Sequence, residues 1–111
     1  MQYLALIYTD ESKPPLENVM ERYGTYTQEI VAAGVMKAGE ALQPVSTATS
    51  IRVRNGKREL TDGPFAETKE QLGGFYMLEC DTLEDAIDWA AKIPSSEIGT
   101  VELRPIMVFD N

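Results

Sequence analysis

The chain has 111 residues, of which 43% are hydrophobic, so it is long enough to bury one core and too short for two. Its 18 acidic and 10 basic side chains give a formal net charge of −8, which opposes contact with the phosphate backbone of nucleic acids. We therefore expect a single domain over residues 1–111 that binds no nucleic acid.

The residue types exclude further classes of site. There is no histidine, and Cys80 is the single cysteine, so a zinc site has too few ligands and no disulfide forms within the chain. The apolar run from Tyr3 to Tyr8 is far shorter than the ~20 residues of a membrane span, and no basic segment precedes it. We expect a soluble, cytoplasmic protein that has no membrane contact, cofactor or metal.

The first third of the chain predicts a strand, a helix and a second strand. Residues 1–9 are apolar on both faces of a period-two strand, and a polar connection with two prolines follows. A helical spacing of apolar residues begins at Leu16 and ends at Gly34, a residue suited to a left-handed helix terminus. Gly24, inside this helix, indicates either close packing or a tolerated surface glycine. Residues 35–42 predict the second strand.

The middle of the chain predicts a β-hairpin. Residues 45–50 fit either an extended edge or a loop, because threonine favours the first and small polar residues favour the second. Residues 51–54 and 57–61 then flank Asn55-Gly56, a pair that favours the positive φ angles of a type I′ turn.

The last third predicts a strand, a helix and a final strand. Residues 75–80 form the strand, in which Cys80 is most simply a small core residue. Asp81 and Glu84 resemble a capping box at the start of a helix. Its apolar stripe comprises Leu83, Ala86, Ile87, Ala90 and Ile93, and the final strand contains Val101, Leu103, Met107 and Phe109.

The order of elements predicts a ferredoxin-like α+β domain: β-α-β, a hairpin, and β-α-β, with an antiparallel sheet and two helices on one face. The first strand is apolar on both faces, so the second face of the sheet needs a cover. Two-fold association is the commonest oligomer, and we therefore expect a homodimer whose facing sheets form an α+β barrel.

The stretch from Asp62 to Gly74 concentrates glycines, a proline and ionisable side chains. In one interpretation it is a rigid turn, with Asp62 accepting hydrogen bonds from nearby amides and Phe65 filling the core. In the other, Asp62 is a pocket carboxylate that acts as a general base or binds a hydroxyl or amine. The pair Gly73-Gly74 permits a bulge or a close backbone approach.

Three charged residues of this stretch have two interpretations. Glu67, Lys69 and Glu70 form either a solvated face or part of a cleft in which they share acid/base work. A hard cation such as Mg²⁺ held by Asp62, Glu67 and Glu70 is only weakly indicated, since no dedicated metal loop is present.

The same stretch resembles the signature of the DGPF group of the YCII-related (YciI-like) bacterial proteins. Four other segments are similar to that group: residues 39–44, 53–57, 86–90 and 101–105. The resemblance implies a ferredoxin-like subunit in a dimeric α+β barrel. Some members are thought to use a His-Asp pair in a small-molecule cleft, and one branch is linked to dehydrochlorination of a hydroxylated aromatic.

Without histidine this chain cannot form that pair. The resemblance then leaves a role for an aspartate, assigned to Asp62, with Tyr23 or Tyr26 as its polar partner. Members are also associated with extracytoplasmic-function sigma factors, which implies a regulatory protein partner. The predicted ligand-binding residues are Tyr23, Tyr26, Asp62, Phe65, Glu67, Lys69 and Glu70.

Three functions follow from these observations. We expect first a homodimer that binds a small molecule in a cleft near the Asp62-Gly63-Pro64-Phe65 turn. The alternatives are an enzyme with lyase-like or isomerase-like acid/base chemistry at Asp62, and an accessory regulator linked to sigma factors.

Overall fold

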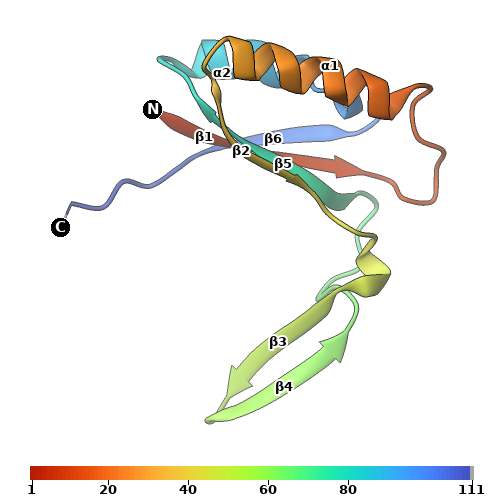
Figure 1. The fold of residues 1–111 in the computed structure, drawn as a ribbon. Coiled ribbons are helices and arrows are strands. Elements are labelled where there is room, and N and C mark those ends of the chain that lie inside the picture. Colours follow the sequence, from red (N-terminus) through yellow and green to blue (C-terminus); the bar gives the residue numbers. More distant parts are fainter. Residues whose placement is uncertain (111) are drawn as a thin grey trace.

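The computed structural model describes residues 1–110 and contains a four-stranded antiparallel sheet in the order β2-β5-β1-β6. Its strands are β1 (Gln2–Thr9), β2 (Met36–Ala41), β5 (Gln71–Glu79) and β6 (Thr100–Pro105). Helices α1 (Val19–Ala32) and α2 (Leu83–Ala91) cover the same face of this sheet (Figure 1). The predicted α+β class and ferredoxin-like arrangement are therefore confirmed.

The core lies between the sheet and the two helices. In β1 the alternate residues Tyr3, Ala5 and Ile7 are buried, because one face of the strand packs under the helices. Helix α1 contributes Tyr26 and Ile30 to the same cluster. Cys80 is also in this cluster, as expected for a small core residue, and burial raises the pKa of its thiol. The other sheet face has no such cover within residues 1–110.

Helix α1 begins three residues later than its apolar spacing predicts. Asn18 precedes it in a left-handed conformation (φ 57°), which asparagine tolerates better than most residues. The stretch from Leu16 to Asn18 therefore belongs to the connection rather than to the helix. At the other end Gly34 has φ 71°, as expected for a glycine that terminates a helix.

The N-terminus of α2 differs from the expected capping box by one residue. Thr82, not Asp81, is the N-cap, and its hydroxyl oxygen accepts a hydrogen bond from the Asp85 amide at 3.1 Å. The side chains of Leu83 and Ile87 are about half exposed, at 51% and 48%. The buried stripe of the helix is consequently narrower than the sequence indicates, because it rests on the alanines.

The paired glycines at the start of β5 produce the bulge that the sequence permits. Ile7 pairs with Gly74 and Tyr8 pairs with Leu72, so Gly73 is an extra residue in β5. Gly74 also lies close to β2, since a Cβ at this position would be 2.9 Å from the carbonyl oxygen of Glu40. Only glycine fits this approach without a shift of the backbone.

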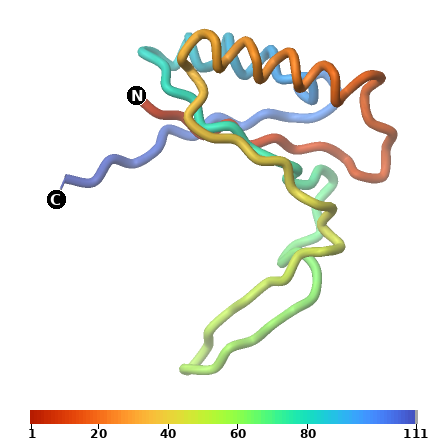
Figure 2. Tube along the Cα trace, in the orientation of Figure 1, coloured from red at the N-terminus to blue at the C-terminus, as the bar shows by residue number. Residues whose placement is uncertain are grey.

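The hairpin forms a separate two-stranded sheet of β3 (Thr49–Arg54) and β4 (Lys57–Asp62). Its turn has φ 53° at Asn55 and φ 76° at Gly56, as the type I′ prediction requires. A short 3-10 helix, η1 (Val45–Thr47), precedes it. The hairpin projects away from the main sheet on the side opposite the helices (Figures 1 and 2).

Two aromatic residues lie outside the positions that the sequence predicts. Phe65 is 79% exposed and does not fill the core, because the loop after β4 carries it away from the sheet. Strand β6 ends at Pro105, so Met107 and Phe109 lie beyond it and are exposed. One further backbone bond, from the Ile106 amide to the carbonyl oxygen of Gln2 at 2.9 Å, is made before the chain leaves the sheet.

Candidate functional site

A cavity of about 410 Å³ lies between α1 and the half of the sheet formed by β2 and β5. Val19, Tyr23 and Thr27 follow one another at intervals of four residues, which places them on one face of α1 above the cavity. The sheet contributes several residues with little or no side chain, and these leave the space open. They are Gly39, Ala41, Gly73 and Gly74.

Two pairs of hydroxyl groups lie in the wall of the cavity. The oxygen atoms of Thr27 and Tyr76 are 2.8 Å apart, and the Tyr23 hydroxyl donates to Ser95 Oγ at 2.8 Å. The rings of Tyr23 and Tyr76 are stacked, with centroids 6.5 Å apart and planes 15° apart. The position of the Tyr76 ring depends on Gly39, because a Cβ there would be 2.7 Å from the ring.

The charge of the lining restricts what the cavity can hold. Its walls contain no lysine or arginine, and Glu40 is the one acidic residue among those that line it. Burial raises the pKa of the Tyr23 hydroxyl, so this group is neutral at physiological pH and both donates and accepts hydrogen bonds. The site can therefore accommodate a largely apolar molecule with hydroxyl or carbonyl groups, and it offers no cation to an anionic ligand.

The structure separates the two tyrosines that the sequence placed together. Tyr23 lines the cavity, whereas Tyr26 is 3% exposed and belongs to the core. The Tyr26 hydroxyl donates to the carbonyl oxygen of Trp89 at 3.0 Å, and its ring meets Tyr76 edge to face at 5.2 Å. Burial raises the pKa of Tyr26 far above its usual value. Tyr26 therefore supports the ring of Tyr76 from behind.

The charged residues of the central stretch do not line this cavity. Asp62 ends β4, opposite Thr49 in the hairpin, and its side chain is exposed. Glu67 and Lys69 are exposed in the following loop, while Glu70 accepts a hydrogen bond from Thr100 Oγ1 at 2.8 Å. The same stretch reaches the cavity only through its last two residues, the glycines 73 and 74.

Sequence reasoning missed several lining residues, which are Thr27, Met36, Tyr76 and Ser95. A polar Thr27 four residues after Tyr23, within an apolar helical stripe, was the available indication. No local pattern marks Ser95, because its hydroxyl reaches Tyr23 only after the chain has folded over 72 residues.

Two features are absent from residues 1–110, a cluster of metal-binding side chains and a membrane-spanning helix. Nowhere in that range do three side chains of the metal-binding types histidine, cysteine, aspartate and glutamate come together as a potential ion site. Neither helix within it is long and apolar enough to cross a membrane.

Comparisons with other proteins cover nearly the whole chain. The family model of the YCII-related domain matches residues 1–110. An uncharacterized protein of Rhizobium meliloti (strain 1021) is 36% identical over 117 residues, which cover 98% of this chain and 94% of that protein. On the extent of both matches, this chain belongs to the family of YCII-related domain proteins.

Proposed function

We propose that this protein is a homodimer that binds a small molecule in the cavity between α1 and strands β2 and β5. The observation that carries the proposal is the pairing of hydroxyl groups inside a mostly apolar pocket. Ligand sites combine apolar walls with a few placed polar groups, and their usual volume is about 300–1,000 Å³. The cavity, at about 410 Å³, falls within this range.

The lining favours an uncharged ligand, or a cation near Glu40, over a phosphate or carboxylate. The stacked rings of Tyr23 and Tyr76 favour a flat, apolar molecule, and the hydroxyls of Thr27 and Ser95 can exchange their present partners for ligand atoms. A hydroxylated aromatic compound satisfies these conditions.

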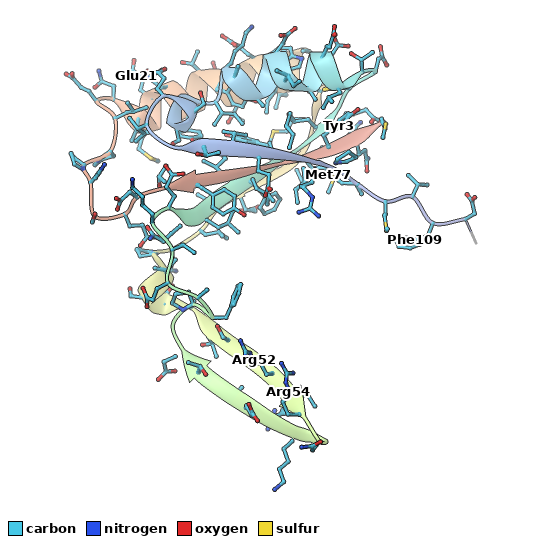
Figure 3. The ribbon with its side chains drawn as sticks, turned by 180° about the vertical axis from the view of Figure 1, so that it is seen from behind. Tyr3, Glu21, Arg52, Arg54, Met77 and Phe109 are labelled. Atoms are coloured by element: carbon cyan, nitrogen blue, oxygen red, sulfur yellow. The ribbon has the colours of Figure 1, made fainter. Side chains whose placement is uncertain are left out.

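The homodimer rests on the sheet face that the helices leave uncovered. We call this surface the open face and define it by Leu4, Leu6, Phe75 and Met77. These four side chains are partly exposed and alternate with the buried residues of β1 and β5. Figure 3 shows Tyr3 toward the helices and Met77 on the other side of the sheet. A second copy with its sheet against this face would remove the apolar side chains from water.

Acid/base chemistry at Asp62 remains the alternative. It requires a substrate that binds at the base of the hairpin, where Asp62 is exposed. Glu67, Lys69 and Phe65, in the loop that follows, are exposed as well. No observation on residues 1–110 favours a regulatory protein partner such as a sigma factor.

The experiment compares ligand binding by matched variants. Neutral hydroxylated aromatic compounds are screened by thermal shift, and affinities of the hits are measured by calorimetry. We expect Thr27→Val to weaken binding by about fivefold, since one hydrogen bond is worth roughly 1 kcal/mol. Thr25→Val on the same helix is exposed and outside the cavity, so it should leave the affinity unchanged.

A third variant tests the alternative site. Asp62→Asn should bind the ligand as the unchanged protein does if the cavity is the site. A loss of binding in Asp62→Asn together with normal binding in Thr27→Val would move the site to the hairpin base, and turnover of a bound compound would identify an enzyme.

A further inference from the structure

The hairpin of β3 and β4, residues 49–62, projects from the domain as an arm. All of its residues except Ser50 are exposed, and it shares no sheet with the rest of the chain. An isolated two-stranded hairpin is marginally stable in water, and stable sheets of this kind have a further strand or a packed face. The arm therefore needs a partner surface.

One face of the arm has three apolar side chains, with Arg58 beside them opposite Val53. Ile51 is paired with Leu60, and Val53 lies on the same side, because residues two apart and residues directly opposite share a face. Their side chains are 63%, 62% and 58% exposed, respectively. The opposite face has Arg52 and Arg54, which Figure 3 shows on the arm. The apolar side chains of the arm thus lie on one face only, and their exposure to water is unfavourable.

The charge of the arm is opposite to that of the remaining chain. The arm has four basic residues (Arg52, Arg54, Lys57 and Arg58) and two acidic ones, whereas the other residues include six basic and sixteen acidic side chains. The two ion pairs found within residues 1–110 are formed by the N-terminus with Glu79 and by Arg22 with Glu97, so neither uses a cation of the arm.

We propose that the arm is an interaction surface for a second copy of this chain. The arm contacts that copy beside the open face. The arm lies on the same side of the sheet as the open face, so a copy seated on that face meets the arm (Figure 1). The acidic body of that copy complements the cations, and its apolar surface covers Ile51, Val53 and Leu60. By two-fold symmetry each copy supplies one arm and receives the other.

This inference rests on the proposed homodimer, and the experiment separates the two. Dimer dissociation constants are measured by sedimentation at several protein concentrations. The arm variant is Ile51→Ser with Val53→Ser and Leu60→Ser, and the control variant is Thr61→Ala, an uncharged change on the opposite face of the same hairpin. A third variant, Met77→Glu, disrupts the open face.

We expect the arm variant to raise the dissociation constant at least about tenfold, because three apolar side chains lose their burial. The control variant should change it by less, and the circular-dichroism spectrum should remain the same in both variants, since the arm lies outside the core. Higher salt should weaken the unchanged dimer through screening of the arm cations.

Two results would overturn the inference in different ways. If the arm variant dimerises as tightly as the unchanged protein while Met77→Glu does not, the arm is not a contact and the open-face dimer stands. If the unchanged protein is a monomer at every concentration, the homodimer and the arm contact fail together.

Discussion

At the scale of single residues, the glycines of this chain divide by what surrounds them. Gly24 has no atom within 4 Å of the position that a Cβ would take, so it is a surface glycine and not a site of close packing. Gly74 is the opposite case, because a Cβ there would approach the backbone oxygen of Glu40. The sequence alone did not separate these two situations.

Substitution of Gly24 and of Gly74 by alanine should change the free energy of unfolding in opposite directions. Gly24→Ala should raise the free energy of unfolding by up to about 1 kcal/mol, since alanine is the better helix former. Gly74→Ala should lower it by about 1–3 kcal/mol, because the new methyl group displaces β2. Urea denaturation measures both, and a similar change in the two variants would contradict the assignment of Gly74 to a tight contact.

The tyrosines of α1 show why site residues are harder to predict than core residues. Tyr23 and Tyr26 lie on the same helix, and the structure has Tyr26 within the core and Tyr23 packed against it. Only one of them borders empty space, and that space exists because Gly39 and Gly74 lie beneath it in other strands. A cavity is a property of several segments, and its lining cannot be derived from one of them.

At the scale of elements, the start of α2 is set by a single hydroxyl group. Thr82→Ala should lower the free energy of unfolding by about 0.5–2 kcal/mol, since the Asp85 amide loses its partner. Asp81→Ala should have a smaller effect, because the Asp81 side chain is not the N-cap group. Thermal unfolding of the two variants compares them, and a larger loss in Asp81→Ala would restore the capping box that the sequence indicated.

Elements whose geometry is encoded locally were predicted well. The hairpin depends on Asn55 and Gly56, whose backbone preferences act without help from the rest of the chain. The loop from Gly63 to Glu70 was predicted less well, and Phe65 is exposed where a core position was considered. Nothing within the loop determines the direction in which it leaves the hairpin.

At the scale of the whole molecule, an ion pair joins α1 to the short 3-10 helix η2 (Pro94–Glu97), far away in the sequence. The Arg22 guanidinium donates hydrogen bonds to the Glu97 carboxylate, and this lowers the pKa of Glu97 below its usual value. The pair therefore stabilises the fold at pH values above the ordinary pKa of a glutamate. The contribution is lost as the pH falls through the lower pKa of the folded state.

The lowered pKa of Glu97 predicts how the stability of the Glu97→Gln variant depends on pH. The variant should melt slightly below the unchanged protein at neutral pH, and the difference should disappear in acid, where Glu97 is protonated. The effect is small because both side chains are largely in contact with solvent. Melting curves between neutral and acidic pH measure it. Glu17→Gln is the control, and a pH-independent difference for Glu97→Gln would exclude the ion pair as its cause.

Sequence patterns correctly predicted the order of the elements, the α+β class, the hairpin turn and the membership of the family that the matches confirm. These follow from periodicity, turn residues and extended motifs, all of which act over short distances along the chain. The tertiary structure alone decided that the stretch from Asp62 to Gly74 meets the cavity only at its two glycines, and that the arm stands apart from the sheet. Both depend on which distant segments come together, because packing, and not local preference, determines where empty space and uncovered surface remain.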